Sequence, residues 1–265
     1  MMNEARIGVG MGAIMLGYRG YLASLRYARE RAQGRPPVNK DPLSPQLPLV
    51  AHADVRRMLL AQKVYVEGAY SLALYAARLV DESRVEPSPE RRQEVALLLE
   101  LLTPVVKSWP SQWCLEASSL AIQIMGGYGY TREFPVEQYW RDNRLNMIHE
   151  GTHGIQALDL LGRKVVMKDG AALNAFAQVV GVAIEQASAL PVLSNQTLQL
   201  KTAWRDVMDT VAELRPAMRD DGEAVLANAY LFLEAFGHVV LAWAWLRQAT
   251  VAQGAVERAR VSEAD

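Results

Sequence analysis

The sequence predicts an all-α protein, in which an up-down four-helix bundle is followed by a C-terminal helical extension. Three observations predict this fold class. Apolar residues recur every three or four positions in nearly every long segment, no run alternates apolar and polar residues, and proline and glycine punctuate the periodic segments. With 265 residues, the chain is long enough for one large helical domain or two small ones.

The first two helices of the bundle are expected at residues 3–31 and 53–81. In the second of them, Val55, Met58 and Val66 fall on one side, as in a helix that packs against a core. Residues 33–48, between the two helices, are rich in proline and polar side chains and are therefore expected to form a connecting loop.

A third helix is expected from Ser88 to Gly126. Ser88 suits the N-cap, and the proline and glutamate that follow it are typical of a first helical turn. Pro104 and Pro110 lie inside this segment and are expected to kink or interrupt the helix, because proline removes a backbone donor and clashes with the preceding turn.

The last part of the bundle is expected to contain the chemistry. Three glycines within residues 126–129 should end the third helix in a turn, and a short segment at residues 135–144 leads to the sequence His-Glu-Gly-Thr at residues 149–152. A further helix is expected from there to about Met167.

The segment Lys168-Asp169-Gly170 is interpreted as a hinge. Beyond it, three helical stretches are expected at residues 171–189, 197–214 and 223–252. The predicted domains are therefore a helical bundle at residues 1–167 and a helical extension at residues 168–265.

Charge and composition exclude several classes of protein. The formal net charge is -1, from 28 basic and 29 acidic residues, so nucleic acid is not expected as a partner. Cys114 is the single cysteine, which rules out an internal disulfide and suits the cytoplasm. The most membrane-like stretch, residues 224–246, contains Glu234 and His238, so a buried helix is favoured over a membrane span.

Glu150 is the candidate catalytic residue. A carboxylate at the start of a helix lies near backbone amides that can donate to an oxyanion, and Gly151 allows a substrate to approach the backbone. That combination suits removal of a proton next to a carbonyl group. From the pattern alone, however, a favourable acid at a helix start is the preferred interpretation of Glu150.

No metal site is expected. His149 and His153 have a spacing that is compatible with metal binding, but no acidic or cysteine partner completes a ligand set. Tyr128 and Tyr130 could line a ligand site, although packing is the preferred interpretation.

Four segments together resemble the C-terminal part of acyl-CoA dehydrogenases. These are NEARIGVG at residues 3–10, HADVRRML at residues 52–59, QIMGGYGYTREFPVEQYWRD at residues 123–142 and IHEGTHGIQ at residues 148–156. The resemblance extends to about residue 164. The residues after 170 are similar to the helical extension of the larger members of that family.

The resemblance implies a catalytic role for Glu150. In the family, the carboxylate of the Glu-Gly-Thr motif takes a proton from the α-carbon of the acyl thioester, while the β-hydrogen leaves as hydride to the flavin of FAD. The backbone N–H of Glu150 would help to polarise the thioester carbonyl. Thr152 matches the family position near the flavin, and Gln156 matches a helix position that faces it.

The resemblance also implies a binding site for the ADP half of FAD. Gln123, Gly126 and Gly127 match the turn that meets it, usually in the FAD of a neighbouring subunit. Arg31 aligns with an arginine that commonly contacts the pyrophosphate. Here Arg31 is followed by Ala-Gln-Gly-Arg rather than by the usual aromatic residue, which departs from the common family pattern.

The implied function is that of the base-bearing portion of an FAD-dependent acyl-CoA dehydrogenase. The N-terminal helical domain and the β-domain of the family are not visible in the sequence. We therefore expect a fragment of a longer protein, a truncated gene product, or one half of a split enzyme whose partner is a separate chain that carries those domains. The other expected partners are an acyl-CoA, an electron-transfer flavoprotein or similar acceptor, and further copies in a dimer or tetramer. The alternative function is a non-catalytic assembly module that pairs with a complete flavoprotein subunit.

Overall fold

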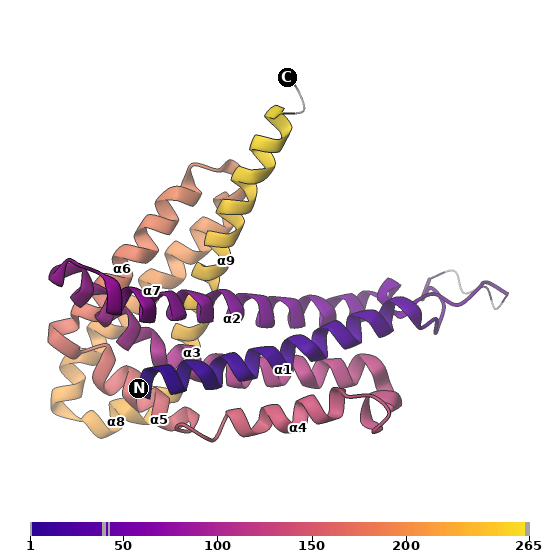
Figure 1. Ribbon diagram of the computed structural model, residues 1–265, viewed down its shortest axis with the longest axis horizontal. Coiled ribbons are helices and arrows are strands. Elements are labelled where there is room, and N and C mark those ends of the chain that lie inside the picture. Colours follow the sequence, from indigo (N-terminus) through magenta and orange to yellow (C-terminus); the bar gives the residue numbers. More distant parts are fainter. Residues whose placement is uncertain (1, 39–40, 42, 263–265) are drawn as a thin grey trace. The chain divides into compact units, whose positions relative to one another are not determined.

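The computed structural model describes residues 2–38, 41 and 43–262, and over these residues the protein is helical without a β-strand (Figure 1). The predicted all-α fold class is therefore confirmed. The described α-helices are α1 (Met2–Glu30), α2 (Ala53–Val85), α3 (Pro89–Met125), α4 (Val136–Asn146), α5 (His153–Asp159), α6 (Met167–Ser188), α7 (Ser194–Asp220), α8 (Gly222–Ala227) and α9 (Ala229–Ser262).

Shorter helical turns join several of these helices. They are the 3₁₀ turns η1 (Leu49–Ala51), η2 (Gly126–Tyr130) and η4 (Pro191–Leu193), and the π-turn η3 (Leu160–Lys164). The loop predicted at residues 33–48 lies between α1 and η1, and its residues 39, 40 and 42 lie outside the described residues.

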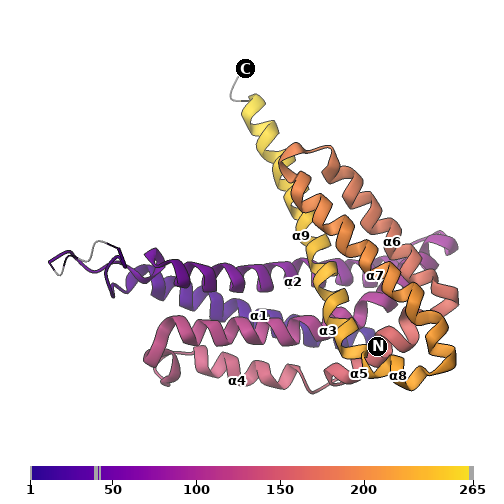
Figure 2. The same ribbon diagram turned by 180° about the vertical axis from the view of Figure 1, so that it is seen from behind.

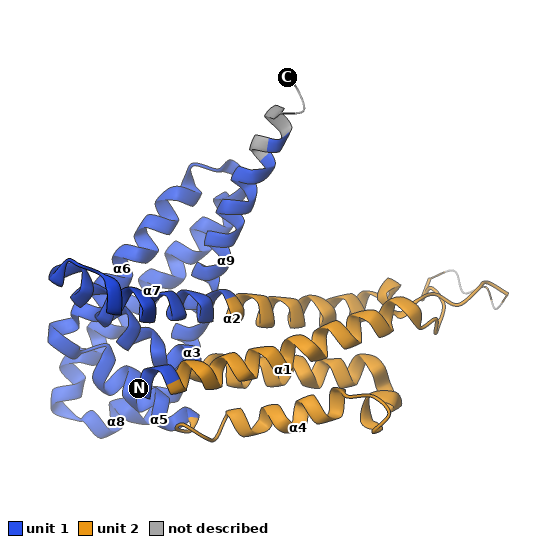
Figure 3. Ribbon diagram, in the orientation of Figure 1, with its two compact units in different colours: residues 1–4, 71–106, 153–265 blue, residues 5–70, 107–152 orange. Residues whose placement is uncertain are grey.

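The helices form two compact units (Figure 3). Of the described residues, unit 1 takes 2–4, 71–106 and 153–262, and unit 2 takes 5–70 and 107–152. Helices α1, α2 and α3 each contribute residues to both units. The two predicted domains, at residues 1–167 and 168–265, stay a prediction, and the two compact units divide the chain at other residues.

Unit 2 is an antiparallel bundle of four helical segments, from α1, α2, α3 and α4, which lie side by side in both views (Figures 1 and 2). Helices α1 and α3 approach closely at Gly17 of α1, where an added Cβ would lie 2.8 Å from the Cβ of Cys114 on α3. A buried hydrogen bond of 3.1 Å from Asn143 Nδ2 to the carbonyl oxygen of Ala13 joins α4 to α1. These contacts hold together the bundle that carries the candidate site.

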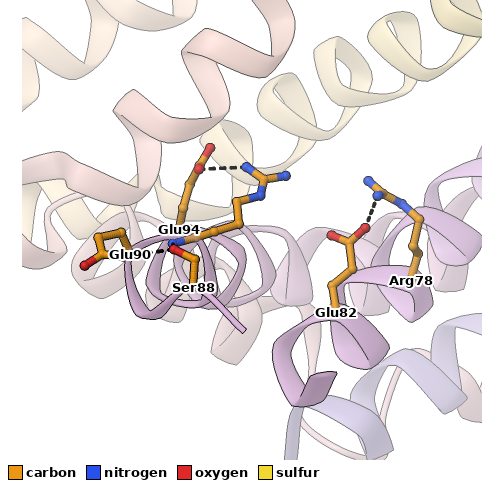
Figure 4. A network of polar contacts seen from close by, with 6 residues as sticks. Arg78, Glu82, Ser88, Glu90 and Glu94 are labelled. Carbon is orange, nitrogen blue, oxygen red and sulfur yellow. Dashed lines mark hydrogen bonds and ion pairs between the residues drawn. The ribbon is translucent and has the colours of Figure 1, made fainter. Parts of the chain in front are cut away.

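Helix α3 begins as its sequence predicts. The backbone N–H of Arg91 donates to Ser88 Oγ at 3.2 Å, and Ser88 Oγ lies 2.9 Å from a carboxylate oxygen of Glu90 (Figure 4). Ser88 therefore caps the first turn, which otherwise has backbone donors without a partner inside the helix. The same close-up shows the ion pair between Arg78 and Glu82 near the end of α2.

The prolines in α3 do not interrupt it, and the kink that was predicted as the other outcome stays a prediction. Pro104 and Pro110 lie inside one continuous helix from Pro89 to Met125. Every residue from 101 to 111 is buried. Burial of a whole helical segment outweighs the cost of a helical proline, which is about 3 kcal/mol in an exposed helix.

Unit 1 has an aromatic core between α6, α7 and α9. Phe176 lies at its centre, with its ring centroid 5.1 Å from that of Trp243 and 5.6 Å from that of Trp204. Phe176 and Trp243 are fully buried. Such edge-to-face ring pairs add to the stability that the buried area provides.

The segment predicted as a hinge has an unusual backbone. Lys168, Asp169 and Gly170 all have positive φ, at 47°, 56° and 86°, so α6 contains three successive residues in the left-handed region near its start. The third stretch of the extension also differs from its prediction. It is two helices, because the chain leaves the helical conformation at Asn228, between α8 and α9.

Helix α9 is the one described helix long and apolar enough to cross a membrane. Its segment Ala229–Val256 has a mean hydropathy of 1.5, and 61% of the most apolar window is buried inside the protein. A buried core helix has the same length and composition, so this helix is weak evidence for a membrane span.

Candidate functional site

Glu150 lies in a turn between α4 and α5 with a strained backbone. Its φ is 55° and that of Gly151 is 94°, so two successive residues adopt the left-handed conformation. A glutamate is uncommon there, and such strained residues cluster at functional sites. Since α5 begins only at His153, Glu150 precedes the helix by three residues. The simple helix-start interpretation of this acid therefore does not describe its position.

The turn is attached to the buried centre of α3 through Lys107. The ammonium Nζ of Lys107 donates to the carbonyl oxygen of Gly151 at 2.5 Å, although 44 residues separate the two along the chain. The Lys107 side chain is completely buried. A buried cation needs a polar partner, and this carbonyl oxygen is one.

Two further charges act on Lys107. Burial lowers the pKa of its amine to about 8, and the positive charge of Arg6 lowers it as well, whereas the negative charge of Glu150 raises it. Arg6 belongs to α1, Lys107 to α3 and Glu150 to the turn after α4. Helices α1 and α3 and the turn after α4 therefore bring two cations and one carboxylate together in unit 2.

Glu150 itself is exposed, as is Thr152, and Gly151 between them is half-buried. An exposed carboxylate on a fixed backbone can accept a proton from a bound molecule. Gln156 has a different environment, since it lies on α5 in unit 1 and its side chain is fully buried. Of the predicted site residues that follow Glu150, Thr152 therefore lies on an exposed turn, whereas Gln156 occupies a buried position on a helix.

The predicted ADP-binding residues lie at the other end of the α3 segment of unit 2. Gly126 and Gly127 are exposed, and a Cβ added to either would meet no atom within 4 Å. Gly126 has a φ of 60°, which suits glycine. Gln123, also exposed, is on the last turn of α3. The end of this helix therefore presents open backbone and an amide to its surroundings.

Tyr128 connects Arg31 with this glycine turn. The guanidinium carbon of Arg31 lies 5.6 Å from the centre of the Tyr128 ring. The same ring packs against Phe134 with 5.6 Å between ring centres, and half of the side chain remains exposed. Arg31, Gln123, Gly126 and Gly127, which lie in two distant parts of the sequence, therefore gather in one region of unit 2.

The two groups of candidate residues are far apart in unit 2. Lys107, beside the Glu150 turn, and Met125, beside the glycine turn, are 18 residues apart on α3. At 1.5 Å per residue, the separation along the helix is about 27 Å.

Among the described residues, no group of three His, Cys, Asp or Glu side chains is arranged to hold a metal ion. His149 Nδ1, in the turn after α4, lies 3.0 Å from the carbonyl oxygen of Leu145 in α4. Arg141, which precedes Asp142 in the motif, pairs with Glu137 at 2.5 Å.

Two family models match the chain in succession. The model for the C-terminal domain of acyl-CoA dehydrogenases matches residues 1–165, which is more than half of the chain. The chain belongs to the acyl-CoA dehydrogenase family. A second model, described as acetyl-CoA dehydrogenase C-terminal like, matches residues 170–265.

Several curated acyl-CoA dehydrogenases are similar in sequence. The 3-methylmercaptopropionyl-CoA dehydrogenase of Ruegeria pomeroyi is 34% identical over 92% of this chain and 41% of its own length. The broad-specificity linear acyl-CoA dehydrogenase FadE5 of Mycobacterium tuberculosis is 31% identical over 97% of this chain and 43% of its own length. The chain thus spans about two fifths of the length of these relatives.

Solved structures of acyl-CoA dehydrogenases share the fold. Caenorhabditis elegans ACDH-11, solved in complex with C11-CoA, matches 94% of this chain and 40% of its own with a TM-score of 0.77 at 20% identity. The acyl-CoA dehydrogenase from Bacillus anthracis complexed with FAD matches 97% of this chain and 43% of its own with a TM-score of 0.71 at 21% identity.

The residues at the glycine turn fit the ADP half of the FAD that the family uses. The guanidinium of Arg31 and the amide of Gln123 are donors for phosphate oxygens, and the open backbone at Gly126 and Gly127 permits close approach of an anion. The exposed half of the Tyr128 ring could stack on a planar base.

Sequence reasoning missed Lys107, which contacts the candidate site, and it also missed the contact of Tyr128 with Arg31. Lys107 is the lone lysine within an otherwise uncharged segment at residues 101–111, and that isolation could have indicated a buried partner. Tyr128 was assigned to packing, although its place inside the glycine motif could have suggested a contact with Arg31. Tyr130 is 83% exposed, so packing does not describe it.

Proposed function

We propose that this chain is the base-bearing C-terminal portion of an FAD-dependent acyl-CoA dehydrogenase, which oxidises an acyl-CoA thioester to the 2,3-enoyl-CoA. The observation that carries the proposal is the exposed Glu150 on two successive left-handed residues, tied to α3 by Lys107. Strain at an exposed acid has a cost, and a function in proton transfer accounts for it. The names of the similar curated proteins support the same reaction.

In this proposal, Glu150 takes the proton from the α-carbon of the thioester. A base must reach the proton directly, and the exposed carboxylate can do so once substrate lies against the turn. The backbone N–H of Glu150 would donate to the thioester carbonyl oxygen and so stabilise the charge that develops there. Thr152, exposed beside the base, would contact the cofactor from the same turn.

FAD would supply the acceptor for the hydride that leaves the β-carbon. Arg31, Gln123, Gly126 and Gly127 would hold its pyrophosphate and adenine end, for which their donors and open backbone are suited. Gln156 is retained as a flavin-side residue. Its side chain is fully buried on α5 in unit 1.

The proposed partners follow from this reaction. They are an acyl-CoA, an electron-transfer flavoprotein or a similar acceptor, further copies of the chain in a dimer or tetramer, and the N-terminal and β-domains of the family on the same or a separate chain. A cytoplasmic location is proposed as well. The single, fully buried free thiol of Cys114 supports it, because it needs no oxidising compartment.

Replacement of Glu150 by glutamine tests the proposal in the complete protein. Glutamine keeps the size of the side chain but cannot accept the proton, so kcat should fall by about 10²–10⁴-fold. Glu185→Gln removes the same charge from an exposed position on α6 and serves as the matched control, with unchanged kcat expected.

Unchanged turnover in a normally folded Glu150→Gln protein would contradict the proposed role. It would favour the alternative function, a non-catalytic helical module that pairs with a complete flavoprotein subunit. Circular dichroism and the thermal midpoint of both variants establish whether the fold is retained.

A further inference from the structure

Lys107 is a completely buried cation whose hydrogen bond ends on the backbone of the Glu150 turn. Its Nζ lies 2.5 Å from the carbonyl oxygen of Gly151. The two residues that precede it, Val105 and Val106, are fully buried as well, so this part of α3 belongs to the protein core. A long side chain from the core therefore reaches an exposed turn and contacts its main chain.

The turn needs such a contact because its backbone conformation is unfavourable. A glutamate with a φ of 55° is strained, whereas Gly151, with a φ of 94°, takes a conformation open to glycine. A strained residue persists only where its surroundings hold it. The hydrogen bond from a charged donor is among the strong interactions available to a backbone carbonyl.

The charges around Lys107 suit this task. Burial and Arg6 lower the pKa of the amine to about 8, and Glu150 opposes them. An amine donates a hydrogen bond in either protonation state, so the contact with Gly151 does not depend on the charge. The attraction between the Lys107 amine and Glu150 further restricts the carboxylate to the neighbourhood of the turn.

We propose that Lys107 is a positioning residue that fixes the Glu150–Gly151 turn through its hydrogen bond to the Gly151 carbonyl, and thereby fixes the direction of the Glu150 carboxylate. The proposal rests on the proposed function, in which Glu150 is the base. Catalysis by a base depends on its position, because a displacement of about 1 Å can reduce the rate by about 100-fold.

Lys107→Met tests the proposal, because methionine keeps an unbranched apolar side chain but has no donor. Hydrogen exchange of the backbone amides at residues 150–153 is the direct measurement in the complete protein. We expect these amides to exchange at least about tenfold faster in the variant, since the turn opens more often without its hydrogen bond. The kcat should fall at least about tenfold, with a much smaller change in KM, because the base is misplaced while the substrate surfaces remain.

Lys164→Met is the matched control. Lys164 is also nearly buried, but it belongs to unit 1 and pairs with Glu100. The same substitution there should lower the thermal midpoint without faster exchange at residues 150–153. If both variants accelerate exchange at these amides equally, the effect of Lys107 is general destabilisation and the proposal is wrong.

The other possible results of these measurements also test the proposal. Faster exchange with unchanged kcat would overturn the positioning role, and unchanged exchange would overturn the fixing of the turn. Failure of the proposed function is recognised separately, by a Glu150→Gln protein that turns over normally. If Lys107→Met does not fold, Lys107→Gln retains a shorter donor, and the same amides should exchange faster in it than in wild type.

Discussion

Lys107 shows how one residue connects burial, charge and the shape of a turn. A charged amine without access to water costs free energy, which is why its pKa is lowered to about 8 from an ordinary value of 10.5. The side chain remains buried because its amine has a partner in Gly151. At the scale of single residues, the hydrogen bond from Lys107 to Gly151 therefore offsets part of the free-energy cost of the strained turn.

The lowered pKa of Lys107 predicts a dependence of stability on pH. Below pH 8 the amine is protonated in both the folded and the unfolded protein, so its contribution is constant. Between pH 8 and 10.5 the unfolded protein binds more protons, so the folded protein gains stability as the pH rises. From pH 8 to pH 9 the gain should be about 1 kcal/mol.

Urea unfolding at pH 7, 8 and 9 measures this gain as a difference between wild type and Lys107→Met. Burial raises the pKa of the Cys114 thiol, so deprotonation in the unfolded protein acts in the opposite direction, but equally in both proteins. A difference in unfolding free energy that stays constant over this range would contradict the prediction.

Gly127 provides a test of the ADP site that does not disturb the fold. Gly127→Ala adds a Cβ with no atom within 4 Å, at a backbone conformation that alanine tolerates. If a pyrophosphate approaches this backbone, the methyl group should weaken FAD binding by about tenfold, which corresponds to about 1.4 kcal/mol. Titration of the apoprotein with FAD measures the affinity, and Gly181→Ala, also at an open glycine, should leave it unchanged.

At the scale of elements, the approach of α1 to α3 depends on a missing side chain. The Cβ position at Gly17 is 2.8 Å from the Cβ of Cys114 and 2.9 Å from its carbonyl oxygen, so no larger residue fits without movement. These two helices carry Arg6 and Lys107, respectively. Their close contact therefore also sets the distance between the two cations beside Glu150.

Gly17→Ala should destabilise the protein by about 1–3 kcal/mol, as expected for a methyl group forced into a packed interface. Gly8→Ala, on the same helix with open space around it, should instead be neutral or stabilising by up to about 1 kcal/mol, because alanine favours helices. Chemical unfolding of the two variants measures both effects, and equal free energies of unfolding would show that the helices do not pack as described.

The sequence predicted the elements better than it predicted their ends and turns. Helical periodicity located α1, α2 and α3, and Ser88 marked the start of α3 because its hydroxyl caps the first turn. The continuity of α3 through Pro104 and Pro110 could not be predicted, because it depends on burial by other parts of the chain. The sequence also predicted that Glu150 begins a helix. In the structure Glu150 lies three residues before α5, in a turn where its φ is 55°.

For the site, the family motif indicated which residues to consider, and the structure gathered Arg31 with the glycine turn through Tyr128. The role of Lys107 was not visible in the sequence. A contact across 44 residues arises from tertiary packing, which no local pattern encodes.

At the scale of the whole molecule, the proposed base and the proposed ADP-binding residues of one chain lie beside positions of α3 that are about 27 Å apart. In the proposed oligomer, each active site combines the Glu150 turn of one subunit with the glycine turn of another. Each active site then takes its two halves from different subunits. A subunit that is defective in one half can therefore be complemented by a subunit that is defective only in the other half.

Mixed oligomers test this arrangement. Glu150→Gln lacks the base, and Gly127→Asp places a negative charge where the pyrophosphate would lie, so each should be inactive alone. Co-expression of the two variants should restore part of the activity, because a mixed pair contains one site with both wild-type halves. Mixtures that stay inactive, although mass spectrometry shows mixed oligomers, would place both halves in one subunit.

The interleaving of the two compact units limits how the gene can change. The chain passes between the units at residues 4–5, 70–71, 106–107 and 152–153, and the first three of these points lie inside α1, α2 and α3. A single recombination event therefore cannot exchange one unit for that of a relative without joining unlike halves of a helix. Hybrids with relatives should therefore keep more stability when each unit comes whole from one parent than when a crossover divides a unit between two parents.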